Sequence, residues 1–238
     1  MALILRKGQN ISDPRLGFIP NDPENWVWDQ FHKSPEVKLS RDFEDAYFYV
    51  DPVDQSTGTA GVRGTKAFSN GEHYWEIIFL EAPIGTSVMV GVGTEQTVLH
   101  MSDYKFVNLL GMDCNSWGLS YKGTVWNNGK SRQYCEPIYD EKTIIGCYLN
   151  LNKGTLAFYK NGVNLGVAFE GLDRVMEPLY PIISSTTTET EIGLGMRACR
   201  YSTLQDKCCS TIRQSLSGYS CVDNLPLPNI MKEYVKGF

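Results

Sequence analysis

The sequence has no long hydrophobic run. No apolar stretch approaches the roughly 20 residues that a helix needs to cross a bilayer. The apolar residues at the N-terminus form a run too short for the core of a signal peptide, and basic residues follow that run instead of preceding it. We therefore expect an intracellular protein, cytoplasmic, nuclear or both, that binds no membrane.

Paired cysteines are also missing. The seven cysteines include no C-x-x-C pair, and their number is odd. The adjacent residues Cys208 and Cys209 suit neither a disulfide framework nor a zinc site. We expect reduced thiols that are mostly packed in the interior, and no metal site.

An excess of positive charge is lacking as well. The 22 basic and 27 acidic residues give a net charge of -5. This balance favours solubility and argues against a surface for nucleic acid or for anionic membranes.

No catalytic or cofactor-binding pattern is complete. His32, His73 and His100 lie in different predicted elements, and neither a nucleophile elbow nor H-E-x-x-H occurs. Residues 193–198 match a dinucleotide-binding fingerprint, but no helix follows within a βαβ unit. Residues 123–131 are one residue too long for a phosphate-binding P-loop. We expect a chain that is not an enzyme and that needs no cofactor.

Short predicted strands dominate what is present. From about Leu39 to about Met196, runs of aromatic and β-branched residues alternate with turns that carry Gly, Asn or Asp. Asn161-Gly162 after one such run is a strong hairpin signal, because both residues tolerate a positive φ. The spacing of strands and turns indicates an antiparallel sandwich or barrel and not a βαβ fold.

The five tryptophans occupy different kinds of segment. Trp75 and Trp117 lie in strand runs and are expected in the core. Trp26 and Trp28 are expected to clamp the N-terminal segment on the sandwich. Trp126 stands beside a turn, and we expect it at the surface.

The pattern becomes helical towards the C-terminus. Leu204, Cys208, Ile212 and Leu216 recur every four residues, which places them on one stripe of a helix. A second short helical stretch is expected after the sequence Leu-Pro-Leu-Pro at 225–228, whose prolines should hold the chain extended. Two amphipathic pieces this small cannot bury a core of their own, so we expect them to pack on the sandwich or on a partner.

Several blocks of the strand region resemble the SPRY (B30.2) family, and they occur in the family's order. In the tail, residues 203–212 resemble the Elongin-binding part of a SOCS box, and residues 225–228 resemble its cullin-5 box. The order of these features is similar to the SPRY domain-containing SOCS box protein family, and most similar to its third-member branch. The SPRY-like blocks are 71–76, 90–94, 116–119, 154–162 and 179–181.

The resemblance implies an all-β SPRY/B30.2 antiparallel β-sandwich with a small C-terminal α-helical SOCS box. The implied divisions are an N-terminal extension over 1–19, a SPRY/B30.2 domain over 20–198 and a SOCS box over 199–238. Such a chain would be the substrate-recognition subunit of a cullin-5 RING E3 ubiquitin ligase, promoting ubiquitination and proteasomal degradation of its target. The chain itself would transfer no ubiquitin.

The resemblance also implies partners and the residues that bind them. Elongin B/C would bind the tail helix, and cullin-5 with its RING protein would bind the Leu-Pro-Leu-Pro segment. An unidentified target would be held by the sandwich through a short peptide degron. The alternatives are a stand-alone SPRY interaction module whose tail is an ordinary clasp, and a lectin-like or enzymatic sandwich. The Elongin-binding residues are Leu204, Cys208 and Ile212, and the cullin-binding residues are Leu225, Pro226, Leu227 and Pro228.

Three segments are expected to bind the target, because loops at one end of a rigid sandwich carry binding residues at low cost to the fold. They are 51–61, 100–110 and 184–189. In the better-known members of the family, equivalent loops grip an asparagine-rich peptide with an Arg and an Ala, a Tyr, and a Val-Trp-Gly. Here Val50 and Asp54 stand at the Arg and Ala positions, and a threonine run replaces Val-Trp-Gly, so the pocket chemistry has changed. The candidate target-binding residues are Tyr104, Pro52, Asp54, Trp126, Thr186, Thr187 and Thr188.

Overall fold

The computed structural model describes residues 22–49, 55–201, 203–216 and 219–236. The predicted extension over 1–19 and the candidate residues Pro52 and Asp54 lie outside the described residues, as does Val50. The chain divides into two compact units, the first ending at Arg200 and the second beginning at Tyr201.

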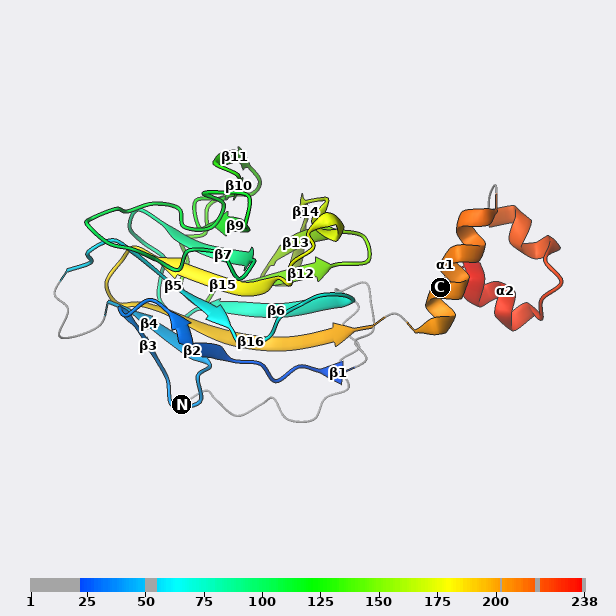
Figure 1. The fold of residues 1–238 in the computed structure, drawn as a ribbon, viewed down its shortest axis with the longest axis horizontal. Helices are drawn as coiled ribbons and strands as arrows, with labels where there is room; N and C mark the ends of the chain where they lie inside the picture. Colours follow the sequence, from blue (N-terminus) through cyan, green and yellow to red (C-terminus); the bar gives the residue numbers. More distant parts are fainter. Residues whose placement is uncertain (1–21, 50–54, 202, 217–218, 237–238) are drawn as a thin grey trace. The chain divides into compact units, whose positions relative to one another are not determined.

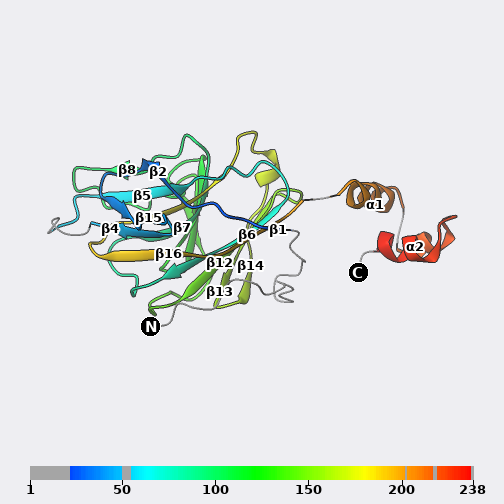
Figure 2. The same ribbon diagram turned by 90° about the horizontal axis from the view of Figure 1, so that it is seen from below.

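The first unit is a sandwich of two antiparallel sheets, which confirms the predicted fold class (Figure 1). Figures 1 and 2 show β4, β6 and β16 in one layer and β5, β7 and β15 in the other. The first sheet runs in the order β14 (Val163–Phe169), β13 (Thr155–Lys160), β12 (Ile144–Asn150), β6 (Glu72–Phe79), β16 (Thr190–Arg200), β4 (Asp45–Phe48) and β3 (Val37–Leu39), with β1 (Asp22–Pro23) also paired to β16. The second runs β11 (Lys130–Gln133), β10 (Thr124–Asn127), β9 (Ser116–Ser120), β7 (Val88–Gly93), β15 (Tyr180–Ser185), β5 (Thr59–Gly64) and β2 (Trp28–Lys33), with β8 (His100–Met101) also paired to β5.

The side-chain alternation of β6 explains why it forms the centre of the first sheet. His73, Trp75, Ile77 and Phe79 are buried and point to the other sheet, while Glu76 between them is half-buried on the outer face. By contrast, every residue of β5, β7 and β9 is buried, as expected for strands covered on both faces. The core therefore lies between the two sheets.

The predicted hairpin after β13 is confirmed. Lys160 and Val163 pair across Asn161 and Gly162, whose φ values are 51° and 81°. Positive φ at both positions defines the turn type whose twist matches that of antiparallel strands.

Four aromatic rings of the core pack together around Trp26, which lies just before β2. Trp26 packs edge-on against Trp28, Phe68 and Trp75 at centroid distances of 6.0, 6.2 and 6.3 Å. Trp75 and Trp117 are buried in the same cluster, as predicted. Truncating a buried tryptophan to alanine costs about 3–5 kcal/mol, so these rings fix the N-terminal strands to the sheets.

A buried carboxylate accompanies these rings. The side chain of Glu24 is 2% exposed, and its Oε1 lies 2.5 Å from Lys66 Nζ and 3.4 Å from His73 Nδ1. Burial alone would raise the pKa of Glu24, but hydrogen bonds and charge from His73 and Lys66 outweigh burial and lower the pKa to about 2. Glu24 is therefore held as an anion.

The second unit comprises α1 (Leu204–Ser215), η3 (Tyr219–Asn224) and α2 (Asn229–Lys236). The expectation that the tail pieces bury no core of their own was wrong in one respect, because they pack on one another through a small cluster. Its buried members are Cys209, Val222 and Val235, with Ile212, Leu216, Leu225, Leu227 and Tyr234 packed against them.

The predicted helical stripe is only partly buried. Ile212 and Leu216 pack against the cluster, but Leu204 and Cys208 are exposed and Cys209 is buried in their place. Each four-residue step advances a position about 40° around a helix, so residues spaced by four wind away from a single face.

Neither a membrane span nor a metal cluster is found in the part of the chain that the structure describes. No helix there is long and apolar enough to cross a membrane. The same residues contain no group of three metal-ligating side chains. Cys147, Cys199 and Cys209 are buried, and burial raises the pKa of the Cys147 thiol well above its ordinary value.

Candidate functional site: a loop pocket and a helical tail

An open pocket lies at one end of the sandwich. Its volume is about 340 Å³, and it brings together residues from all three predicted target-binding segments. A fourth segment, 84–87, completes it and was not predicted from the sequence. The turn signal Pro83-Ile84-Gly85 could have found it. The lining residues are Gln55, Ser56, Gly85, Thr86, Phe106, Thr186, Thr187 and Thr188.

Threonine hydroxyls join two of these segments. Thr186 is buried, and its Oγ1 accepts from Ser87 N–H (2.9 Å) and donates to Ser87 O (3.1 Å). Thr187 Oγ1 donates to Ile84 O (3.0 Å). Both hydroxyls therefore build the wall of the pocket by tying 184–189 to 84–87. Thr188 also lines the pocket and is half-buried.

Gly85 permits this close contact. A Cβ on Gly85 would lie 1.8 Å from Thr187 Oγ1, and its φ of 91° is one that residues with side chains rarely adopt. The Gly85 carbonyl accepts from Tyr121 O–H (2.6 Å), and the Thr86 carbonyl accepts from Lys122 Nζ (2.8 Å). The residues that follow β9 thus fix the 84–87 segment.

The second predicted segment contributes two aromatic side chains. Phe106 lines the pocket, and Tyr104 packs edge-on against Phe106 with a centroid distance of 6.5 Å. Tyr104 is 67% exposed and Phe106 is 37% exposed. Tyr104 is not among the lining residues and instead stands next to Phe106 at the rim.

Trp126 lies apart from the pocket. It is half-buried against Met89, Leu110 and Ile182, and its Nε1 donates to Thr124 Oγ1 (2.9 Å). Among the described candidates, Trp126 is not brought together with Thr186, Thr187 and Thr188, which line the pocket. A contact between Trp126 and a target stays a prediction.

The described residues that line the pocket carry no charge, and they combine polar groups with apolar surface. It offers the side-chain amide of Gln55, the hydroxyls of Ser56, Thr86 and Thr188, and the ring of Phe106. Such a lining can hydrogen-bond a neutral polar group and pack one apolar face against it, which suits peptide segments better than isolated ions.

The second unit presents the predicted Elongin-binding residues in two different ways. Leu204 is 80% exposed and opens α1, and Cys208 is exposed one turn later. Ile212 is half-buried and packs against the cluster of this unit. An exposed leucine followed by a small side chain one turn later leaves room for a partner helix to approach.

The Leu-Pro-Leu-Pro segment also divides by exposure. Leu225 and Leu227 are half-buried in the cluster, whereas Pro226 and Pro228 are exposed. The Leu227 N–H donates to Leu225 O (2.8 Å), so the chain turns at Pro226 and is not extended as expected. The fixed φ of proline suits the central position of such a three-residue turn. The Pro228 carbonyl accepts from the N–H groups of Met231 and Lys232, which starts α2.

Models of two protein families match the chain. The SPRY domain model matches residues 72–197, and the SOCS box model matches residues 202–236. The chain belongs to the SPRY domain-containing SOCS box protein family. The limits 20–198 and 199–238 expected for its two domains stay a prediction.

Named relatives are consistent with this assignment. The chain is 36% identical over 210 residues to "SPRY domain-containing SOCS box protein 3" of Xenopus laevis, with 88% of this chain and 57% of that protein covered. It is 30% identical over 229 residues to "SPRY domain-containing SOCS box protein 1" of Homo sapiens, with 87% and 79% covered. The resemblance to the third-member branch is confirmed, and the chain spans 57% of the length of that Xenopus relative.

Solved structures share the fold of the sandwich. The TRIM65 PSpry domain superposes with a TM-score of 0.57 at 20% identity, covering 72% of this chain and 90% of that one. The SPRY domain of human HERC1 gives 0.56 at 17% identity, covering 71% and 97%.

Proposed function

We propose that this chain is the substrate-recognition subunit of a cullin-5 RING E3 ubiquitin ligase. The observation that carries the proposal is the presence, in one chain, of a SPRY domain with an open loop pocket and a SOCS box that directly follows it. The sandwich would bind the target protein, and the SOCS box would bind Elongin B/C and cullin-5. Ubiquitination of the target would lead to its proteasomal degradation.

In this proposal Elongin B/C binds the exposed side of α1. Covering the side chain of Leu204 with a partner pocket would contribute roughly 1.5–3 kcal/mol. Cys208 supports the same contact because its small exposed side chain allows a partner to approach closely. Ile212 would act from beneath, by fixing α1 to the cluster of its own unit.

Cullin-5 would bind the turn that precedes α2. Its exposed members are Pro226 and Pro228, and the two leucines hold the turn in place from the inside. A turn already fixed by Leu225 and Leu227 loses little conformational freedom when a partner docks on it.

The target would be held at the loop pocket. The uncharged hydroxyl and amide groups favour a short peptide with neutral hydrogen-bonding side chains, and Tyr104 with Phe106 offers it an aromatic face. The chain itself would carry out no chemistry. It would raise the effective concentration of the target near a recruited ubiquitin-conjugating enzyme.

The test is affinity purification of the full chain from cells, followed by quantification of Elongin B, Elongin C and cullin-5. We expect all three with the full chain and none with a chain that ends at Arg200. Absence of Elongin B/C from the full-chain sample would favour the alternative, a stand-alone interaction module. In that case Ile212, Leu225 and Leu227 would serve only to stabilise the helical unit.

A further inference from the structure

The segment that carries Tyr104 and Phe106 has an unusual backbone. Asp103 and Tyr104 both have a φ of 58°, and the Lys105 N–H donates to Ser102 O (3.2 Å), which makes a tight turn with two left-handed central residues. Such turns favour Asn, Asp and Gly, because other side chains crowd the backbone in this conformation. A tyrosine here is held by its surroundings and not by its own preference.

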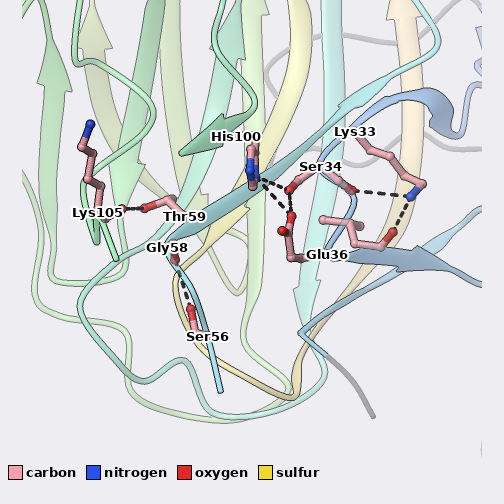
Figure 3. Close-up of polar contacts among 9 residues, drawn as sticks. Lys33, Ser34, Glu36, Ser56, Gly58, Thr59, His100 and Lys105 are labelled. Atoms are coloured by element: carbon pink, nitrogen blue, oxygen red, sulfur yellow. Dashed lines mark hydrogen bonds and ion pairs between the residues drawn. The ribbon is translucent and has the colours of Figure 1, made fainter. Parts of the chain in front are cut away.

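Thr59 supplies much of that hold. It is fully buried at the start of β5, and its Oγ1 accepts from Val107 N–H (3.0 Å) and donates to Lys105 O (2.9 Å). Figure 3 shows this side chain reaching from β5 to the backbone at Lys105. Two residues earlier, the Thr57 carbonyl accepts from Tyr104 N–H (2.8 Å). The hydrogen bonds of Thr57 and Thr59 thus bracket the two aromatic residues.

Gly58 lets the two segments approach. A Cβ at this position would lie 1.9 Å from the Met101 carbonyl oxygen, so only glycine fits between Thr57 and Thr59. The Gly58 carbonyl accepts from Ser56 O–H (3.1 Å), and Ser56 lines the pocket. The first and second segments therefore form one wall.

A polar cluster fixes the start of the same segment. His100 Nδ1 lies 2.8 Å from Ser34 Oγ and 3.2 Å from Glu36 Oε2, and the Ser34 hydroxyl donates to Glu36. These contacts tie β8 to the connection between β2 and β3, as Figure 3 shows. Ser34 Oγ and Glu36 both face the same ring nitrogen, so this trio lacks the relay geometry of a catalytic triad.

We propose that Thr59 is a positioning residue for target capture. Its hydroxyl holds residues 103–107 in the strained conformation that presents Tyr104 and Phe106 beside the pocket. A target then meets two aromatic side chains that are already placed and does not have to order them. This inference rests on the proposed function, because it assumes that the target binds at the pocket.

The test compares Thr59→Val with Thr59→Ser in the full chain. Valine keeps the shape of threonine but removes the hydroxyl, and serine keeps the hydroxyl. The probe is a peptide selected from a displayed random library on the wild-type chain, and retained only if Thr188→Arg, which fills the pocket, abolishes its binding. Thr97→Val is the matched control, because Thr97 is also buried and also donates to a distant carbonyl, Asn115 O (3.0 Å), at the opposite end of β7 from the pocket.

We expect Thr59→Val to bind the peptide about tenfold more weakly, because the peptide must then order the side chains of Tyr104 and Phe106 itself. Hydrogen exchange at the amides of Tyr104 and Val107 should be faster in the same variant. Thr59→Ser should bind the peptide as the wild type does. Thr97→Val should lose thermal stability but keep peptide affinity, which separates positioning from a general loss of stability.

Two results would overturn the inference. If Thr188→Arg abolishes binding and Thr59→Val does not weaken it, or if Thr59→Ser fails to restore it, Thr59 does not position the site and the pocket keeps its proposed role. If no selected peptide responds to Thr188→Arg, the pocket is not the capture site, and the proposed role of the pocket falls together with this inference.

Discussion

At the scale of single residues, a change at Tyr104 should affect thermal stability and peptide binding differently. Because its φ of 58° opposes the preference of tyrosine, Tyr104→Gly should leave the melting temperature unchanged or raise it. The same change removes an exposed aromatic face, so a peptide that binds at the pocket should lose at least about 1 kcal/mol of affinity. Calorimetric melting and peptide titration on the full chain measure the two effects.

The opposite outcome for Tyr104 has a clear meaning. A Tyr104→Gly variant that melts at a much lower temperature but binds the peptide normally would show that the ring packs the loop and does not contact the target. Lys142 has the same φ of 58° and does not line the pocket, so Lys142→Gly is the matched control and should leave peptide affinity intact.

Glu24 gives the sandwich a defined acid sensitivity. Its pKa is lowered from 4.5 to about 2, so its contribution to stability is fully present above pH 4.5 and is lost as the pH falls from 4.5 towards 2. The contribution at neutral pH is on the order of 3 kcal/mol. We expect Glu24→Gln to be less stable than the wild type at pH 7, with the difference shrinking at pH 3. Urea unfolding at both pH values measures the difference in the free energy of unfolding. An equal difference at pH 7 and pH 3 would contradict the lowered pKa of Glu24.

At the scale of elements, the proposed Elongin contact lies on the first turn of α1. Leu204→Ser should weaken binding to purified Elongin B/C by roughly 1.5–3 kcal/mol, because it removes an apolar side chain that only a partner would bury. The cooperative melt of the sandwich should not change. Isothermal titration with Elongin B/C measures the affinity.

The chain offers a closely matched control for this change. Ile230 is 82% exposed on α2, compared with 80% for Leu204 on α1. Ile230→Ser should leave Elongin affinity intact. An equal loss in both variants would mean that exposed apolar area in general, and not the first turn of α1, binds Elongin.

The turn before α2 is the proposed cullin contact. Pro226→Ala together with Pro228→Ala should weaken cullin-5 recruitment to the Elongin-bound complex, because both prolines are exposed and stiffen the turn. Elongin affinity should change little. Leu225 is left intact, because it packs in the cluster that supports α1. Size-exclusion chromatography with cullin-5 measures recruitment. An equal loss of Elongin binding would contradict the assignment of the two contacts to separate parts of the helical unit.

Local elements were predictable from the sequence, and their long-range contacts were not. The Asn161-Gly162 hairpin and α1 follow from turn chemistry and from helical spacing. The burial of Cys209 in place of Cys208 depends on Val222 and Val235, which reach α1 only after η3 and α2 fold back. The 84–87 side of the pocket depends on Thr186 meeting Ser87 across 99 residues, a contact that only the pairing of β15 with β7 creates.

At the scale of the whole molecule, the two proposed binding surfaces belong to separate units. The pocket lies in the unit that ends at Arg200, and Leu204 lies in the unit that begins at Tyr201. Changes at sites that share no contacts have additive effects. The double variant Tyr104→Gly with Leu204→Ser should therefore lose peptide affinity and Elongin affinity by the same factors as the single variants. Coupling above about 0.5 kcal/mol between the two changes would show communication between the units.

Strand β16 has a mechanical consequence for a captured target. It begins at Thr190, directly after the threonines of the pocket, and ends at Arg200, where the chain leaves the sandwich. Eleven residues in extended conformation span roughly 35 Å. Tension between a target in the pocket and a partner on the tail would run along this strand. The hydrogen bonds between β16 and β6 are perpendicular to the strands. A force along β16 would therefore load these hydrogen bonds together, and the domain should resist mechanical unfolding by such a force.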